Sequence, residues 1–160
     1  MAESDYGKII NLSGGGAAGA RPNFSSYAAS KAALVRLTEV LAHETRDMGI
    51  DVNCLAPGAM NTRMLAVVLR AGPENAGAEE YRKAVRQSET GGAQPENAAR
   101  LAVFLASSES DGISGRLVSA VWDNWQDLSK YREELKGSDI YTLRRIVPQD
   151  RGLDWDRTEV

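Results

Sequence analysis

Short apolar runs alternate with longer amphipathic segments along this chain. Lys8 to Leu12 reads KIINL and Ile50 to Leu55 reads IDVNCL, and both runs are followed by glycine or proline. Such runs are typical of buried strands. Pro57 and Gly58 break the second run, and Arg116 to Val121 has the same apolar character. We therefore predict three strands, at 8–12, 50–55 and 116–121.

A long helix is predicted between the first two strands. Ser25 and Ser26 are residues that cap helix amino termini, and Gly49 is typical of a helix end. Apolar residues recur between them at helical spacing, which predicts a helix from Ser25 to about Met48. We expect the core-facing stripe of this helix to consist of Leu34, Leu37 and Leu41.

The region between the second and third strands is predicted to be mainly helical. Residues 64–70 and 81–88 suit short helices, whereas the sequence AGPENAGAEE at 71–80 is typical of a loop. Pro95 opens a stronger amphipathic pattern that continues to Ala106. Because strands separated by helices form right-handed crossovers, we predict an α/β fold with a parallel sheet.

The chain changes character at Trp122, and we divide it there into a domain at 1–121 and a tail at 122–160. Residues 122–137 are polar and aromatic and are predicted to form one helix, and residues 143–160 are predicted to be extended and partly ordered. The tail aromatics either cover an edge of the core or close over a ligand site; they are Trp122, Trp125, Tyr131 and Tyr141.

Length and charge restrict the class of protein. The 160 residues suffice for one domain with an ordinary core, and 19 basic against 22 acidic residues give a net charge of -3. The basic residues are scattered, so nucleic acid is not an expected partner. The sequence shows neither a signal-peptide pattern nor an apolar run of membrane-spanning length, so we expect a cytoplasmic protein with no membrane partner.

The single cysteine and the single histidine offer little for a disulfide or a metal centre. Cys54 has no second cysteine to pair with, and His43 falls short of a usual zinc ligand set. We expect Cys54 to be a packing residue and His43 to be solvated, and no metal site is predicted.

Tyr27 and Lys31 are candidate catalytic residues. They lie one helical turn apart in the predicted long helix, and the three residues between them are small. A tyrosine hydroxyl, with an ordinary pKa near 10, needs a cationic neighbour to act as a general acid or base at neutral pH. An ammonium at ~4 Å contributes about 4 kcal/mol at an effective dielectric constant of about 20, which is the size required. An isolated Tyr-x-x-x-Lys pair is also common on solvated helix faces, so the pair alone does not distinguish a catalytic site from such a face.

Five blocks in order resemble short-chain dehydrogenases/reductases. They are GKIINLS, YAASKAAL, VNCLAPGAMNTRM, PENAARLAVFLAS and the ISG turn, and together they cover about residues 7–121. The chain is similar to the carboxyl-terminal part of that family. The resemblance implies a Rossmann-like parallel sheet, truncated to about three strands with flanking helices, and an oxidoreductase that exchanges hydride with NAD or NADP.

The resemblance also implies roles for individual residues. In the family a serine hydrogen-bonds the substrate oxygen, a tyrosine exchanges a proton with it, and a lysine assists the tyrosine and holds the cofactor ribose; these roles fall to Ser13, Tyr27 and Lys31. A second cofactor-contacting segment corresponds to Asn53, Pro57, Gly58, Met60 and Thr62. Without the resemblance, the same segment reads as a turn followed by a helix cap.

Ser13 stands one residue away from the usual position of the family's serine. The family places that serine 13 residues before the tyrosine, and Gly14 occupies this position here. Either the following loop bulges by one residue, or the hydroxyl group is displaced from the reacting centre.

The glycine-rich turn that binds the cofactor pyrophosphate in the family has no counterpart in this sequence. Gly14, Gly16 and Gly19 spell G-x-G-x-x-G after a strand, but Pro22 disfavours the immediate helix that such a turn requires. We expect a flexible loop beside the substrate instead. Because the family's first strands are also absent, we expect the first strand here to be an unpaired edge.

Three functions are open at this point. The first is a short-chain oxidoreductase for a small carbonyl or alcohol substrate, with the remaining nucleotide site supplied by another chain. The second is a truncated, non-redox binding module that forms a homo-oligomer through the strand edge and the long helix. The third is a cofactor-free acid/base enzyme that uses Tyr27 and Lys31.

Overall fold

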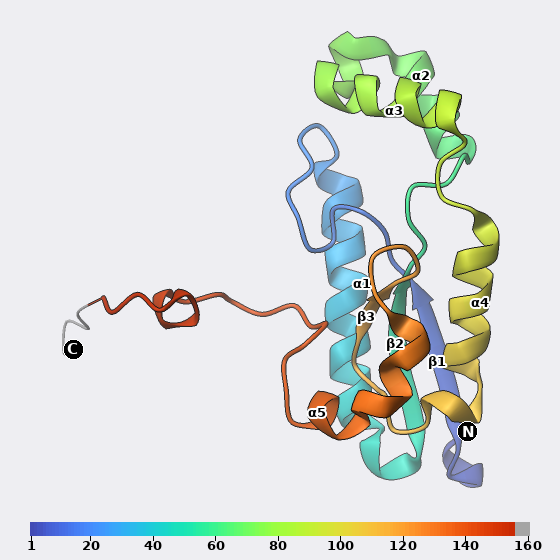
Figure 1. Cartoon of the computed structure of the whole chain (residues 1–160), viewed down its shortest axis with the longest axis vertical. Helices are drawn as coiled ribbons and strands as arrows, with labels where there is room; N and C mark the ends of the chain where they lie inside the picture. The colour runs from blue at the N-terminus through green and yellow to red at the C-terminus, as the bar shows by residue number, and fades with distance from the viewer. Residues whose placement is uncertain (156–160) are drawn as a thin grey trace.

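The computed structural model describes residues 1–155 and contains one parallel sheet. Its strands are β1 (Gly7–Leu12), β2 (Ile50–Ala56) and β3 (Leu117–Ser119), in the spatial order β1-β2-β3 (Figure 1). The register of the first pair runs from Gly7 opposite Ile50 to Leu12 opposite Leu55. The predicted α/β fold with a truncated, Rossmann-like parallel sheet is confirmed.

Helices cover both faces of the sheet. Helix α1 (Ser25–Glu44) packs on one face and α4 (Pro95–Ala106) on the other, while α2 (Arg63–Ala76) and α3 (Ala78–Thr90) form a hairpin beyond the end of the sheet (Figure 1). A short helix, α5 (Arg132–Lys136), follows β3. Five 3₁₀ segments complete the described residues: Ala2–Ser4, Arg46–Met48, Ser108–Ser110, Trp125–Tyr131 and Pro148–Arg151.

The central strand β2 contributes side chains to both layers of the core. Ile50, Val52 and Cys54 belong to clusters on the α1 side, whereas Leu55 belongs to the cluster built around α4. This alternation is the normal consequence of strand geometry. Cys54 is completely buried, so the prediction that it is a packing residue is confirmed.

The buried face of α1 differs from the predicted leucine stripe. Val35, Thr38 and Ala42 are buried, whereas Leu37 is 49% exposed. Thr38 reaches the sheet with its hydroxyl, which accepts a hydrogen bond from the Asn11 amide at 2.9 Å. The stripe prediction is wrong at Leu37 because small and polar side chains make the close approach to the sheet, and the leucines lie at its margin.

The long helix also ends earlier than predicted. Helix α1 stops at Glu44, and a 3₁₀ turn at Arg46–Met48 continues the chain to Gly49. Gly49 has a left-handed backbone with φ of 62°, which is the conformation that favours glycine at such an end. His43 is exposed near the end of the helix, as predicted.

The predicted loop at 71–80 is wrong, because most of these residues are helical. Gly72 leaves the helical conformation, with φ of 72°, and Pro73 begins a new helical turn that extends to Ala76. Proline is favoured in the first turn of a helix because its nitrogen needs no partner there. Gly77, with φ of 85°, then separates α2 from α3.

β3 and the tail that follows it form shorter regular segments than predicted. β3 comprises only Leu117–Ser119, and the predicted single tail helix is a 3₁₀ segment at Trp125–Tyr131 followed by α5. Trp125 is buried against Phe104, with ring centres 5.8 Å apart. Of the two roles expected for the tail aromatics, covering the core or closing over a ligand site, Trp125 has the first. Two other tail aromatics are mainly exposed, with fractions of 85% for Trp122 and 53% for Tyr131.

The two edges of the sheet differ. The outer edge of β3 is covered, because Leu117 donates its backbone N–H to the Tyr141 carbonyl at 2.8 Å and Arg116 donates its guanidinium to the carbonyls of Ser138 and Ile140. Within residues 1–155, β1 pairs with β2 alone, so its other edge is open, as expected.

The last described residues extend away from the body of the molecule (Figure 1). This arm is extended around the 3₁₀ turn at Pro148–Arg151, in agreement with the prediction for the tail, and residues 156–160 of that prediction lie outside the described part.

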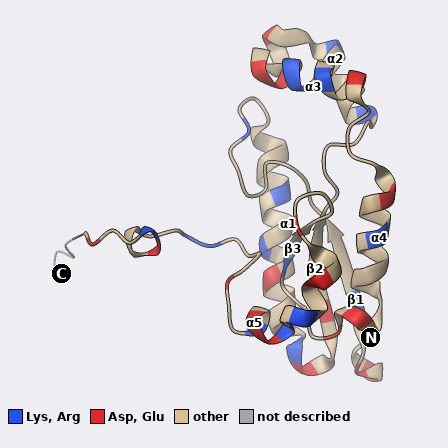
Figure 2. Ribbon diagram, viewed as in Figure 1, with Lys and Arg blue, Asp and Glu red and all other residues tan. Residues whose placement is uncertain are grey.

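Basic and acidic residues are interspersed over the helices (Figure 2). In the described part of the chain, no helix is both long and apolar enough to span a bilayer. The expected cytoplasmic location stays a prediction.

Candidate functional site

Tyr27 and Lys31 lie together at the carboxyl ends of the strands. Both belong to the first turns of α1, and the Lys31 ammonium is 5.8 Å from the centre of the Tyr27 ring. Lys31 Nζ also donates a hydrogen bond to the carbonyl of Leu12, the last residue of β1, at 2.9 Å. Both side chains are only partly buried, so the pair is tied to the sheet and still reaches solvent.

Ser13 and Gly14, at the end of β1, have different neighbours. Ser13 continues the ladder, because its N–H donates to the Leu55 carbonyl at 2.8 Å, and its side chain is buried with 3% exposure. Gly14 lies against the Tyr27 hydroxyl, so closely that a Cβ atom at this position would collide with that oxygen. Gly14 is therefore the residue that contacts the Tyr27 hydroxyl, and the Ser13 hydroxyl forms no hydrogen bond with it.

The Ser13 hydroxyl points toward the interior. Its Oγ has no hydrogen-bond partner of normal geometry within residues 1–155, and the group beside it is the Cys54 thiol, a weak hydrogen-bonding group. Burial raises the pKa of this thiol, and the neighbouring Thr38 and Ser13 hydroxyls lower it by less. Cys54 is therefore a neutral packing group behind the site.

The second predicted segment forms the turn that follows β2. Pro57 is buried, and Gly58 has φ of 87° with a crowded α-carbon, since a Cβ there would lie 2.6 Å from a methyl group of Val121. Met60 forms an isolated antiparallel bridge with Gly92, and Thr62 is exposed at the amino end of α2 without a side-chain capping bond. The turn is as the sequence predicts, and its glycine is required by both conformation and space.

Asn53, unlike the turn residues of this segment, uses its side chain to connect β2 with the backbone just before β3. Its side chain is buried, its amide donates to the Ile113 carbonyl at 2.6 Å, and its oxygen accepts from the Arg116 N–H at 3.1 Å. Since both ends of the amide are already used, Asn53 fixes the approach to β3.

The glycine loop after β1 does not have the geometry of a pyrophosphate-binding turn. Gly19 is followed by a turn, and α1 begins only at Ser25, so no helix amino terminus faces the glycines directly. Gly16 has φ of 98° and packs against Ala28 of α1, which explains a glycine at that position without a ligand.

Arg21 is a neighbour of Tyr27 that the sequence does not predict. Its guanidinium carbon is 5.8 Å from the Tyr27 ring centre and 4.0 Å from the Phe24 ring centre. The same guanidinium forms an ion pair with Glu80 of α3 at 2.8 Å. The two charged residues are far apart in the sequence, so no local pattern links them.

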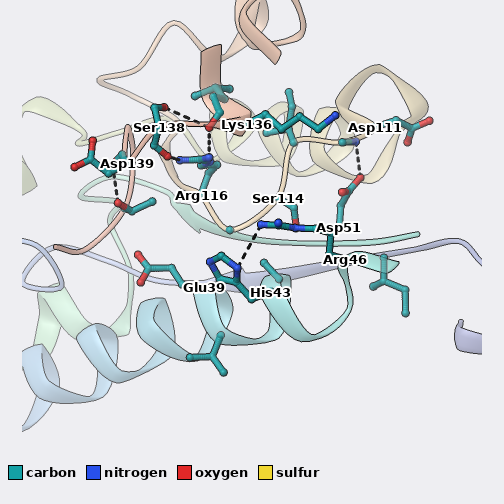
Figure 3. Close-up of a pocket in the computed structure, with 18 of the residues that line it drawn as sticks. Glu39, His43, Arg46, Asp51, Asp111, Ser114, Arg116, Lys136, Ser138 and Asp139 are labelled. Atoms are coloured by element: carbon teal, nitrogen blue, oxygen red, sulfur yellow. Dashed lines mark hydrogen bonds between the residues drawn. The ribbon is translucent and has the colours of Figure 1, made fainter. Parts of the chain in front are cut away.

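A cavity of about 840 Å³ lies at the opposite end of the sheet, near the amino ends of the strands (Figure 3). Two of its polar residues hold the fold: Arg116 binds backbone carbonyls of the tail, and Asp51 accepts from Lys8 and from the Gly112 N–H. It is therefore separate from the Tyr27 and Lys31 pair.

Known proteins resemble both the sequence and the fold of this chain. Residues 1–120 match the family model described as enoyl-(acyl carrier protein) reductase. The 3beta-hydroxysteroid dehydrogenase 1 of Eggerthella lenta is 42% identical over 109 residues, which are 68% of this chain and 40% of that protein. The acetoacetyl-CoA reductase of Shinella zoogloeoides is 33% identical over 120 residues, which are 75% of this chain and 47% of that protein.

A solved structure gives the same picture. The gluconate 5-dehydrogenase of Burkholderia cenocepacia, in complex with NADP and tartrate, superposes with a TM-score of 0.56 and 27% identity, over 74% of this chain and 44% of that one.

The fold and these matches define an α/β protein with a Rossmann-like fold. The chain belongs to the short-chain dehydrogenase/reductase family and corresponds to the carboxyl-terminal part of its members. It spans less than half the length of these curated relatives, at 40% and 47%.

Proposed function

We propose that this chain is the acid/base part of a short-chain oxidoreductase that interconverts a small carbonyl compound and its alcohol with NAD or NADP. The observation that carries the proposal is the Tyr27 phenol beside the Lys31 ammonium at the carboxyl ends of a parallel sheet, where open α/β sheets bind their ligands. Family membership supports the same chemistry. The relatives named above are a hydroxysteroid dehydrogenase, an acetoacetyl-CoA reductase and a gluconate dehydrogenase.

Tyr27 moves the proton in this proposal. In the reducing direction its hydroxyl gives a proton to the substrate oxygen as the carbonyl carbon gains hydride, which yields the alcohol and a phenolate. Lys31 stabilises that phenolate by its positive charge, and the Leu12 carbonyl holds the lysine in place. In the oxidising direction the phenolate takes the proton from the alcohol.

Ser13 has a separate place in the proposal. Because its hydroxyl is buried on the Cys54 side and Gly14 faces Tyr27, we expect the Tyr27 hydroxyl to meet the substrate oxygen without help from Ser13. Ser13 then supports the end of β1 by its backbone bond to Leu55.

The described residues fit the nicotinamide side of a cofactor better than the pyrophosphate side. When bound, a nicotinamide cofactor supplies or accepts the hydride. Lys31, Pro57, Gly58, Met60 and Thr62 are the residues we propose to contact it, Lys31 by its ammonium and the turn after β2 by its backbone. The glycine loop after β1 does not supply a pyrophosphate cradle, so we propose that another chain or another copy completes the nucleotide site.

The open edge of β1 also supports a second candidate, a non-redox module that forms a homo-oligomer. This edge offers unpaired backbone groups, and α1 exposes Leu37 and Val40 by 49% and 43%. An assembly of this kind needs neither cofactor nor substrate.

One experiment separates the two candidates. NADH and NADPH are titrated by fluorescence, and cofactor oxidation is followed with acetoacetyl-CoA, diacetyl and a 3-ketosteroid. The 160-residue chain is assayed alone and co-expressed with the part of the Shinella zoogloeoides reductase that it does not match. Turnover in either form that Tyr27→Phe lowers by about 10²-fold or more supports the oxidoreductase. Absence of turnover in both forms, with a dimeric mass, supports the self-associating module.

A further inference from the structure

The α2–α3 hairpin is a separate unit that joins the body at a narrow neck. It has its own small core, in which Val68, Ala76 and Ala84 are buried. Its two ends meet where Met60 bridges Gly92 and where the Ala93 N–H donates to the Ala59 carbonyl at 2.9 Å. Figure 1 shows the hairpin beyond the carboxyl end of the sheet, on the side of the molecule where α1 begins.

A second attachment joins the hairpin to the loop before α1. Arg21 places both Nε and one terminal nitrogen 2.8 Å from Glu80 Oε2, and the two side chains are 25% and 14% exposed. The Arg21 guanidinium stacks on Phe24, and Phe24 packs against the apolar core of the hairpin. The guanidinium is therefore held at its edge by a carboxylate and on its face by an aromatic ring.

The same loop carries a weaker contact and borders a cavity. The Asn23 amide donates to the Ala76 carbonyl at 3.4 Å, and Gly77 passes so close to this amide that a side chain there would collide with it. A cavity of about 320 Å³ lies between the loop and the hairpin, with Glu80 in its wall.

This loop leads directly into the helix that carries Tyr27. Phe24 is the residue before α1, and its carbonyl accepts the Ala28 N–H at 2.8 Å. Arg21 also lies 5.8 Å from the Tyr27 ring. The residues that hold the hairpin thus also border the residue to which we assign proton transfer.

We propose that Arg21 and Glu80 form a latch that holds the α2–α3 hairpin closed over the entrance to the Tyr27 and Lys31 site. Release of the latch lets the hairpin swing about its neck and admits the substrate. A partly buried ion pair suits this purpose, because it holds one arrangement and still opens at modest free-energy cost and in high salt. Arg21 is a positioning residue in this proposal. The proposal rests on the proposed function only for the claim that the molecule admitted is a substrate of the Tyr27 and Lys31 pair.

Hydrogen exchange of the 160-residue chain tests the latch without any turnover assay. We expect Arg21→Gln and Glu80→Gln each to raise backbone exchange in α2 and α3 by about tenfold, with no change in β2. The double variant Arg21→Glu/Glu80→Arg should restore the slow exchange. Glu79→Gln is the matched control, because Glu79 is the neighbouring carboxylate on the same helix and its side chain is 72% exposed.

The outcomes decide between the alternatives. Unchanged hairpin exchange in both single variants, or an equal increase in Glu79→Gln, overturns the latch. If Arg21→Gln also loses protection from hydrogen exchange in β2, this variant has failed to fold. The hairpin exchange of Glu80→Gln then tests the latch by itself.

Turnover then separates the latch from the function assigned to the site. In an active assembly the latch variants should change KM for the substrate more than kcat. A hairpin that opens in both variants while Tyr27→Phe affects no turnover leaves the latch standing and refutes the proposed function.

Discussion

Ser13 and Gly14 offer a matched pair of substitutions, because they are adjacent in the chain and contact different groups. Ser13→Ala removes a buried hydroxyl that has no normal hydrogen-bond partner among the described residues. Gly14→Ala adds a methyl group against the Tyr27 hydroxyl. The first change acts in the interior and the second acts at the site.

The structure gives the direction and size of both effects. An ordinary contact needs 3.4–4 Å, and the added Cβ at Gly14 would lie much closer than that to the Tyr27 hydroxyl oxygen. The Tyr27 hydroxyl must retreat by about 1 Å, a misplacement that costs about 10²-fold in rate when it affects a reacting group. We expect stability to fall by about 1–3 kcal/mol through overpacking. Since the backbone of Gly14 is not left-handed, the contact alone causes the change.

Ser13→Ala should be close to neutral. An unpaired buried hydroxyl contributes no hydrogen bond, so its removal should change the free energy of unfolding by less than about 1 kcal/mol, in the stabilising direction. The assays are thermal unfolding, turnover in the active assembly, and NMR of the Tyr27 ring carbon that bears the hydroxyl, assigned with Tyr27→Phe. Gly14→Ala should shift that resonance and Ser13→Ala should not. A loss of turnover in Ser13→Ala as large as in Gly14→Ala would place the Ser13 hydroxyl at the reacting centre and refute this reasoning.

Three further predictions concern the stability of the fold. Lys8→Met removes contacts to Asp51 at 2.8 Å and Asp111 at 2.7 Å, and we expect a loss of about 2 kcal/mol by denaturant unfolding. Burial lowers the pKa of Lys8, but the bonds to the two aspartates raise it by more, so the pKa lies above its ordinary value of 10.5. The stabilisation by the charged Lys8 should therefore be complete below pH 10.5 and disappear as the pH rises through the raised pKa. A difference in unfolding free energy between Lys8→Met and wild type that does not shrink as the pH rises above 10.5 would contradict this. Asn53→Ala should cost about 2–3 kcal/mol, because two buried backbone groups lose their partner, and it should leave the Tyr27 resonance unchanged. Trp125→Ala should cost about 3–5 kcal/mol in thermal unfolding, and a loss below 1 kcal/mol would show that this side chain does not cover the core.

Local sequence signals suffice for the elements whose causes are local. The amphipathic helix at Pro95–Ala106 is predicted to the residue, because a proline begins it and a regular apolar pattern continues through it. The β2 strand ends where Pro57 and Gly58 follow it, within one residue of the prediction. The one-turn spacing of Tyr27 and Lys31 likewise places both side chains on one face as soon as the helix forms.

Contacts between residues far apart in the sequence cannot be predicted from local patterns. The leucine spacing of α1 does not reveal that Thr38 rather than Leu37 approaches the sheet, because that depends on Asn11 in another strand. The pairing of Arg21 with Glu80 is similarly set by how the hairpin folds back. Composition alone also misassigns 71–80, where a proline restarts a helix rather than ending it.

Steady-state oxidation of NADPH tests the role of Tyr27 most directly, measured with a carbonyl substrate for the chain alone and in the co-expressed assembly, with Tyr27→Phe as the comparison. We predict turnover by the wild-type chain in at least one of these forms, and a loss of about 10²–10⁴-fold in Tyr27→Phe at unchanged thermal stability. Turnover that survives this substitution, or no oxidation in either form with any carbonyl compound tested, would contradict the assignment of Tyr27 as the proton donor.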